Sequence, residues 1–264
     1  MSEAREDVTF GYLPLEGHDP NKLPAYTPQQ GSHGPPFRAI DLRHLAPNAR
    51  FQGPIGACTG FSTRGAIRGL MRAAVEDGLW EGESFDPSPL AIYAGARQRL
   101  HMLSSDSGVP LSAVADVLRE GIPREQLWPF NPQRWAELPP ADVWTDAKGH
   151  QLVNSTLLRH DTASIRAAFN DGCILVTGVP VYDGPRGMTS AAAFRDGDVS
   201  MPSSRDSIVG WHALSLWGHD PVGDVVFFQQ SWEGFASSQN GFGTLPINYV
   251  LRLANELMAF GAIQ

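Results

Sequence analysis

Residues 52–71 read QGPIGACTGFSTRGAIRGLM, and this segment joins a turn to a helix at a single cysteine. The Gly- and Pro-rich turn runs directly into Cys58. After it, Ile67, Leu70 and Met71 recur at the three- and four-residue spacing of an amphipathic helix. Unpaired backbone N–H groups at the start of a helix stabilise a thiolate, so the position favours a nucleophilic cysteine with a lowered pKa. A buried structural cysteine is the more frequent use of such a residue, and the segment alone does not decide between the two.

The composition is that of an ordinary globular chain. It has 264 residues, of which 42% are hydrophobic and 18% charged, and this length suits one large domain or two closely packed lobes. The net charge of −8 and the scattered arginines argue against nucleic acid as a partner. No run of about 18 apolar residues occurs and the first residues are polar, so we expect no membrane partner and a cytoplasmic location.

Helical patterns fill the first part of the chain after an extended arm. The arm, residues 1–40, is rich in Pro and Gly, and it either docks on the body through Tyr12, Leu13 and Leu15 or is partly mobile. The periodicity predicts helices over 58–79, 90–100 and 110–120. The Pro- and Trp-rich stretch 129–150 is expected to be irregular.

The second part of the chain is rich in strand patterns. A short helix is expected after Asp161 or Thr162, with a stop at Gly172, and strands follow over 173–182, 211–219 and 225–232. The order predicts an α+β chain with a helical lobe, 41–150, and a β-rich lobe, 151–264, facing each other across a cleft.

Of the 8 histidines, His212 differs because it lies inside an apolar strand-like run. A lone histidine in such a run is more often a satisfied core residue, and the alternative is that it serves as the base for Cys58. His219, at the end of the same run, is the weaker alternative. The chain has no Cys-x-x-Cys or His-Glu-x-x-His spacing, no Gly-x-Ser-x-Gly elbow and no phosphate loop. We therefore expect neither a metal nor a cofactor.

Two separated segments resemble the papain-like cysteine peptidases, especially bacterial members without a long inhibitory pro-region. QGPIGACTGF is similar to the family's Gln-Gly-x-x-Gly-Ser-Cys-x-x-Phe segment, with Gln52 at the family's spacing of six residues before Cys58. VGWHALSLWGHD, residues 209–220, resembles the Gly-x-His-Ala-Val strand that carries the catalytic histidine. The resemblance implies a two-lobe fold, helical and β-barrel-like, with Cys58, His212 and Gln52 in the cleft between the lobes. The arm, residues 1–40, is too short to resemble the usual inhibitory pro-region, and we expect it to lie across the lobes as a strap or to cover part of the cleft.

Two further segments extend the resemblance over most of residues 10 to 250. DSGVPLSAVADVLREGI, residues 106–122, places Gly108 where the family pairs its backbone with an extended substrate, and Ser107 and Trp211 become neighbouring substrate-binding residues. VVFFQQSWEGFASSQNGFGTLPINYV, residues 225–250, resembles the Asn-Ser-Trp-Gly segment, but Gln230 replaces the asparagine and Glu233 the glycine. Trp232 is retained and implies a shield over the catalytic histidine.

The resemblance implies a thiol-dependent peptidase that acts on peptide or protein substrates without a cofactor. Cys58 forms an acyl-enzyme, His212 is its acid and base, and Gln52 with the N–H of Cys58 stabilises the oxyanion. Gln230 is expected to orient His212 through the Nδ1–H. Two alternatives stay open because of Gln230 and Glu233: an acyltransferase, ligase or amidase on the same scaffold, or a catalytically impaired peptide-binding homologue.

Overall fold

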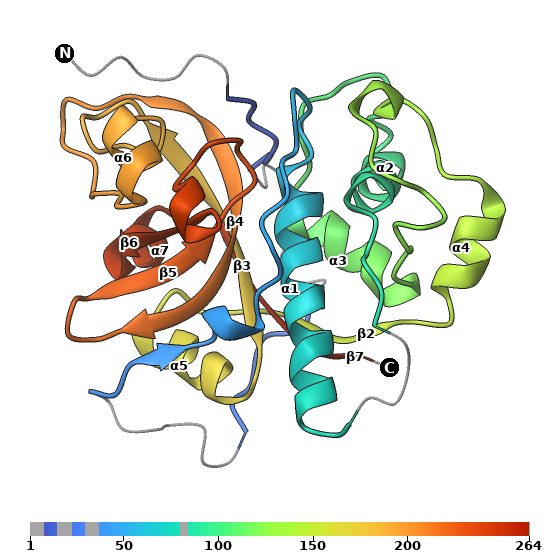
Figure 1. Cartoon of the computed structure of the whole chain (residues 1–264), viewed down its shortest axis with the longest axis horizontal. Coiled ribbons are helices and arrows are strands. Elements are labelled where there is room, and N and C mark those ends of the chain that lie inside the picture. Colours follow the sequence, from blue (N-terminus) through green and yellow to red (C-terminus); the bar gives the residue numbers. More distant parts are fainter. Residues whose placement is uncertain (1–7, 15–22, 30–36, 80–83, 264) are drawn as a thin grey trace.

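The computed structural model describes residues 8–14, 23–29, 37–79 and 84–263, with helices gathered on one side and strands on the other (Figure 1). The helical side contains α1 (Cys58–Glu76), α2 (Pro89–Arg99), α3 (Leu111–Glu120) and α4 (Ala141–Ala147). The sheet consists of β1 (Ile40–Asp41), β2 (Leu152–Leu157), β3 (Ile174–Tyr182), β4 (Ile208–Asp220), β5 (Val225–Gln229), β6 (Phe242–Pro246) and β7 (Glu256–Ile263). Three short helices accompany the sheet: α5 (Thr162–Asn170), α6 (Ala191–Asp196) and α7 (Ile247–Leu253).

The sheet is antiparallel, with the order β2-β7-β3-β4-β5-β6 and β1 paired with β4. Its central strand β3 is buried on both faces: Val176 belongs to the core against the helices, whereas Leu175 belongs to the core against α5 and α7. In the register of β3 and β4, Val179 lies opposite His212. The pairing therefore fixes the position of the histidine in the middle of the molecule.

Helix α1 is the element that joins the two sides, because it packs on β4, β3 and β7 (Figure 1). Close packing depends on small residues: a Cβ on Gly69 would lie 2.6 Å from the fully buried ring of Trp217. The helix begins at Cys58, at the edge that faces the sheet. Packing therefore sets the position of the sulfur relative to β4.

The expected helices and the cores of the expected strands are present, but one predicted irregular region is wrong. Ser88 caps α2 by accepting a hydrogen bond from the N–H of Ala91, and Asp161 caps α5 in the same way. Within the supposedly irregular stretch 129–150, α4 follows Pro140 directly. Proline is tolerated at the start of a helix because the first N–H groups need no partner within the helix. Pro139 and Pro140 therefore precede the beginning of α4 and do not indicate irregular chain.

The described parts of the arm lie against the body. Tyr12 is buried, and residues 24–26 pair with β2, where the N–H of Tyr26 donates to the carbonyl of Leu157 at 2.8 Å. Residues 8–14, in dark blue, run between the helices and the sheet (Figure 1). Leu15, the third expected anchor, lies outside the described residues.

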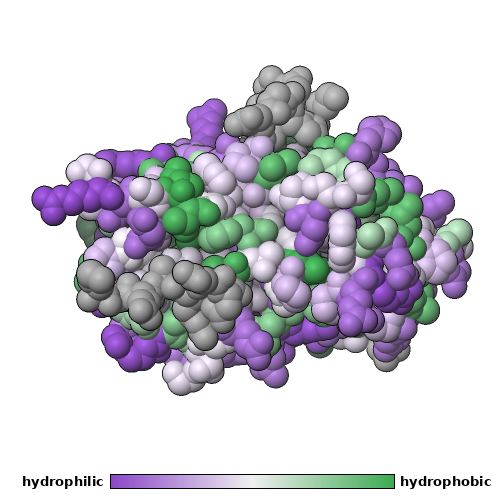
Figure 2. All heavy atoms as spheres, turned by 90° about the horizontal axis from the view of Figure 1, so that it is seen from above, coloured by the Kyte–Doolittle hydropathy of each residue, from purple (hydrophilic) through white to green (hydrophobic). Residues whose placement is uncertain are grey.

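The surface seen from above shows small apolar groups separated by hydrophilic side chains (Figure 2). Large exposed hydrophobic side chains such as Phe37, Leu79 and Val222 come from unrelated parts of the chain. Scattered residues of this kind need no partner to explain them. Among the described helices, none has the length and apolar character that a membrane span requires.

Candidate active site

Cys58 is the first residue of α1 and has no exposed surface. The N–H of Ala213 lies 3.4 Å from its Sγ, and the backbone N–H groups of Gly11 and Thr59 also point to the sulfur. These donors favour the thiolate, but removal of water has the larger effect and raises the pKa of Cys58 to about 12. The predicted lowering of the pKa is therefore wrong for this covered state.

His212 comes to the same place from β4, because the next residue, Ala213, is the one that contacts the sulfur. Its Nε2–H donates to Oε1 of Gln230 at 3.0 Å. The expected contact of Gln230 with Nδ1 is wrong: Nδ1 has no hydrogen-bond partner among the described residues, and the thiol of Cys58 is not an exception. Burial lowers the pKa of His212 to about 3, and the hydrogen bond that His212 donates to Gln230 opposes this shift.

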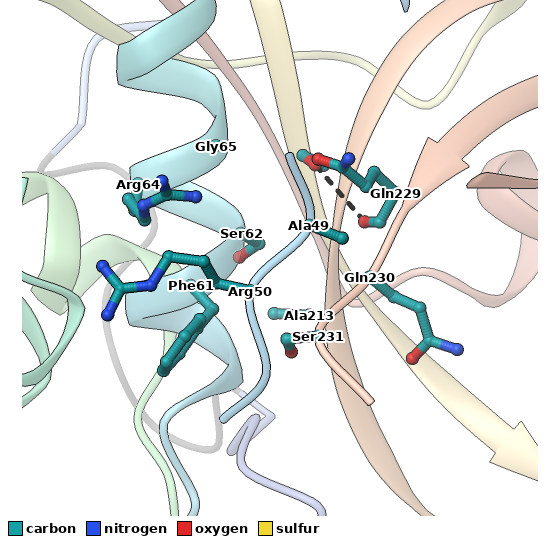
Figure 3. Close-up of a pocket in the computed structure, with 11 residues that line it drawn as sticks. Ala49, Arg50, Phe61, Ser62, Arg64, Gly65, Ala213, Gln229, Gln230 and Ser231 are labelled. Carbon is teal, nitrogen blue, oxygen red and sulfur yellow. Dashed lines mark hydrogen bonds between the residues drawn. The ribbon is translucent and has the colours of Figure 1, made fainter. Parts of the chain in front are cut away.

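Two adjacent glutamines stand at the end of β5, and only the second forms a hydrogen bond with His212. Gln229, the last residue of β5, donates to the carbonyls of Pro47 and Asn240, both at 3.0 Å. The close-up shows the side chains of Gln229 and Gln230 pointing in opposite directions from the backbone (Figure 3). Gln230 lies just beyond the end of β5, and its side chain is one methylene longer than that of the asparagine in the family pattern. Its amide oxygen still reaches the imidazole of His212.

Trp232 covers the histidine. Its ring stacks on His212 with centroids 4.2 Å apart and an angle of 25° between the planes, and the residue is buried. Phe194 stacks on Trp232 in turn, at 6.2 Å. The indole excludes water from the bond between His212 and Gln230, whereas Glu233, the neighbour of Trp232, is exposed.

Gln52 is held so that its amide nitrogen is left to donate. Its Oε1 accepts a hydrogen bond from the hydroxyl of Ser231 at 2.6 Å, which fixes the orientation of the amide. Its Nε2 donates to two backbone carbonyls, those of Ile55 at 2.8 Å and Thr9 at 3.1 Å. Ser231 was missed by the sequence reasoning, although it stands between Gln230 and Trp232 in the segment that carried the resemblance.

The turn that contains Gly108 forms the opposite wall of the site. The carboxylate of Asp106 accepts from the hydroxyl of Tyr93 at 2.6 Å and from the N–H of Gly56 at 2.9 Å, and so ties the turn to the segment before Cys58. Gly108 has φ +84° and lies directly against Gly11 of the arm, so a side chain fits there neither sterically nor conformationally. Ser107 is exposed beside this turn.

Residues 8–13, called here the strap, run through the site as an extended peptide. On one side, the N–H of Val109 donates to the carbonyl of Gly11, and the N–H of Leu13 to the carbonyl of Val109, both at 3.3 Å. On the other side, the N–H of Tyr12 donates to the carbonyl of Trp211 at 3.4 Å. The chain therefore covers Cys58 with its own backbone, and Val109, not Gly108, supplies the paired groups.

Other predicted or conceivable groups lie apart from this arrangement. His219 is seven residues further along β4, and its Nδ1 faces Arg166 of α5 at 3.1 Å, so it is not the partner of Cys58. Within the described part of the chain, no three His, Cys, Asp or Glu side chains are close enough to hold a metal ion. The chemistry that the arrangement supports is acyl transfer through a thiol.

Comparison with known proteins gives relatives at low sequence identity. No family model matches the chain. It is 25% identical over 208 residues to an uncharacterized peptidase C1-like protein of Acanthamoeba polyphaga mimivirus. That match covers 75% of this chain and 64% of the relative, so the chain spans less than two thirds of the relative's length.

Two solved structures share the fold. Xylellain, a cysteine protease from Xylella fastidiosa, matches with a TM-score of 0.81 at 22% sequence identity, over 100% of both chains. Digestive procathepsin L 3 from the larval midgut of Tenebrio molitor matches with a TM-score of 0.63 at 16% identity, over 92% of this chain and 77% of that chain. The agreement extends over both the helices and the sheet.

Proposed function

The chain has the papain-like fold of cysteine proteases, and from this fold we propose that it hydrolyses peptide bonds through Cys58. The observation that carries the proposal is the carbonyl of Thr9, a peptide carbonyl that accepts hydrogen bonds from Nε2 of Gln52 at 3.1 Å and from Nε1 of Trp232 at 3.0 Å. A substrate carbonyl that Gln52 binds in this way is polarised by the amide, as the proposed attack by Cys58 requires. The mimivirus relative, itself named peptidase-like, supports the same reading.

The proposed reaction uses the free nitrogen of the imidazole. Nδ1 of His212 takes the proton from Cys58, and the thiolate attacks the carbonyl carbon to form a C–S bond. Nε2 of Gln52 and the N–H of Cys58 stabilise the oxyanion, and the imidazolium gives its proton to the leaving amine as the C–N bond breaks. Water then hydrolyses the thioester. Gln230 holds the tautomer with Nε2–H, which keeps Nδ1 ready for the proton.

The strap must leave before a substrate can bind, since it occupies the backbone groups of Val109 and Trp211 and the amide of Gln52. The arrangement is therefore a closed resting state in which the thiol and the imidazole are both neutral. Once the strap moves, water and substrate enter, the burial that opposes the charges is relieved, and the N–H donors around the sulfur remain.

The test compares Cys58→Ser with Cys173→Ser in hydrolysis of fluorescent peptides made from a denatured protein. We expect the first variant to lose at least a thousandfold in kcat/KM and the second to keep its rate. An added amine separates hydrolysis from transfer, because a transferase forms the amide product instead of the acid. Equal loss in both variants would contradict the assignment of Cys58, and absence of turnover even when Tyr12→Ala loosens the strap would favour the peptide-binding alternative.

A further inference from the structure

One peptide group, the one between Ile55 and Gly56, is held at both ends by side chains near Cys58. Its carbonyl oxygen, which belongs to Ile55, accepts a hydrogen bond from Nε2 of Gln52 at 2.8 Å. Its N–H, which belongs to Gly56, donates to Oδ1 of Asp106 at 2.9 Å. Because a peptide group is planar and rigid, the two contacts depend on each other. The position of Asp106 therefore sets the direction in which the Ile55 carbonyl meets the amide of Gln52.

The Ile55 carbonyl in turn aims the amide of Gln52. A glutamine amide nitrogen has two N–H bonds to donate. One N–H of Gln52 is taken by Ile55, and the other is directed to the carbonyl of Thr9 in the strap at 3.1 Å. A substrate carbonyl takes the place of the Thr9 carbonyl in the proposed reaction. A shift of the Ile55–Gly56 peptide would therefore turn the second N–H away from the oxyanion.

Asp106 is itself fixed by α2. Tyr93 of α2 is fully buried; its hydroxyl donates to the same Oδ1 at 2.6 Å and accepts from the N–H of Gly108 at 3.3 Å. Burial and the nearby Asp106 raise the pKa of Tyr93, so the hydroxyl keeps the proton that it donates. One helical turn further, Arg97 donates to the carbonyl of Leu103 at 2.6 Å and holds the beginning of the same turn. The helical side therefore determines where the carboxylate lies.

The segment before Cys58 is also packed tightly between the turn and the strap. A Cβ on Gly56 would lie 3.0 Å from the backbone oxygen of Asp106 and 3.1 Å from the nitrogen of Gly108. A Cβ on Gly11 of the strap would lie 2.2 Å from the carbonyl carbon of Gly56. When the strap leaves, the packing of Gly11 is lost. The hydrogen bond from Gly56 to Asp106 then holds this segment from the side of the turn.

Resting on the proposed peptidase function, we propose that Asp106 is a positioning residue for the oxyanion hole. It acts through the Ile55–Gly56 peptide and not on the substrate. The peptide keeps the amide of Gln52 and the N–H of Cys58, two residues after Gly56, in the arrangement in which both donate to one oxygen. The oxyanion forms only as the carbonyl is attacked, so loss of Asp106 should lower kcat and leave KM nearly unchanged.

The first experiment compares two reactions of the same thiol in the Tyr12→Ala background, which loosens the strap. Alkylation of Cys58 by iodoacetamide is a displacement at a saturated carbon and forms no oxyanion, whereas peptide hydrolysis does form one. Dividing kcat/KM by the alkylation rate therefore cancels any change in strap opening or in the thiol itself. We expect Asp106→Ala to lower this ratio by about tenfold or more, through kcat, with KM changed by no more than about threefold.

Further variants separate positioning from support of the fold. Asp106→Asn keeps an oxygen that accepts from both Gly56 and Tyr93, so the ratio should stay within about twofold of the parent. Asp146→Ala is the matched control, because it removes a carboxylate that binds Arg124 on the helical side away from the site, and it should leave the ratio unchanged. Where Asp106→Ala fails to fold, Tyr93→Phe decides: it keeps the ring, removes the donor to Asp106 and should lower the ratio about fivefold.

The outcomes distinguish the role of Asp106 from the proposed function. An unchanged ratio in the deciding variant, or an equal decrease in Asp106→Asn or Asp146→Ala, overturns the role of Asp106 while peptidase activity stands. Absence of turnover in the Tyr12→Ala parent, although iodoacetamide still alkylates Cys58, overturns the proposed function and with it the role of Asp106. A decrease in the ratio that the asparagine variant restores supports both.

Discussion

The two cysteines are both buried, but only Cys58 is covered by a segment that could move and expose it. Cys58 is fully buried and Cys173 is 8% exposed, and burial raises the pKa of each to about 12. Cys173 lies in the core beneath β7, against Gly261, and the nearby Asp171 raises its pKa further. Cys58 is surrounded by backbone N–H donors and covered by the strap. Under the proposed function, the strap over Cys58 detaches and exposes a nucleophile, whereas Cys173 stays a structural thiol in the core, although burial raises both pKa values alike.

The largest effect expected on the accessibility of the two cysteines comes from loosening the strap at Tyr12. Truncating a buried aromatic residue costs about 3 kcal/mol, which corresponds to about a 100-fold larger open population if the loss acts on the strap alone. Tyr12→Ala should therefore raise the rate at which iodoacetamide alkylates Cys58 by about 100-fold and leave Cys173 unchanged. The adducts are counted by mass spectrometry. Parallel acceleration at both cysteines would mean general unfolding, and an unchanged rate at Cys58 would mean that the strap does not limit access.

A second prediction concerns pH, because the closed state holds His212 and Cys58 neutral. The pKa of His212 is lowered from 6.5 to about 3, so its contribution to closure is complete above pH 6.5 and is lost as the pH falls toward 3. The pKa of Cys58 is raised from 9.0 to about 12, so its contribution is complete below pH 9 and is lost as the pH rises toward 12. Closure is therefore strongest between these limits.

Acidification to pH 5 should accordingly enlarge the open population by about 30-fold, since each unit below 6.5 contributes about tenfold. Hydrogen exchange of the strap amides, corrected for the intrinsic effect of pH, measures this change. In His212→Gln, hydrogen exchange of the strap amides should no longer increase in this way as the pH falls. His219 serves as the control, because it is buried beside Arg166 and away from the strap. If the increase in exchange at low pH persists in His212→Gln and disappears in His219→Gln, the effect belongs to His219 and the prediction is wrong.

The adjacent glutamines give a smaller and more selective contrast. Loss of the hydrogen bond between Gln230 and His212 costs about 1.4 kcal/mol in orientation, so Gln230→Ala should lower kcat about tenfold at nearly the same melting temperature. Gln229 instead joins the carbonyls of Pro47 and Asn240, so Gln229→Ala should lower the melting temperature and leave kcat close to wild type. A fall in kcat for Gln229→Ala alone would reverse the roles of the two residues.

The sequence predicted the site where its signals are local. The helix that begins at Cys58, the strand with His212 and the position of Gln230 all follow from short segments, and the papain-like α+β fold that they implied is confirmed. Helix α4 was missed because Pro140, which starts it, also signals a break. The orientation of the imidazole ring was missed because a strand pattern fixes which face a residue occupies but not which ring nitrogen meets its partner.

A strap across the lobes or over part of the cleft was expected, but its contacts were beyond local reasoning for a different reason. The hydroxyl of Tyr12 donates to Glu256, which is 244 residues away in the sequence, and no periodicity or cap connects them. The arm reads as a Pro- and Gly-rich segment with isolated apolar anchors, which is compatible with docking and with mobility alike. Only the pairing of its backbone with Val109 and Trp211 distinguishes a segment that closes the site from one that merely covers the surface.

The smallest effect is expected at Glu233, which replaces the glycine of the family pattern and adds a carboxylate next to Trp232 in the sequence. The side chain is exposed, whereas its neighbour Trp232 turns inward to stack on His212. An exposed charge is screened by water and salt, and such substitutions change free energies by about 0.5 kcal/mol or less. Glu233→Gly should therefore change kcat/KM by no more than about twofold at moderate salt. A tenfold change that disappears at high salt would mean that this carboxylate acts on the substrate at long range, and would extend the site beyond the side chains that the strap covers.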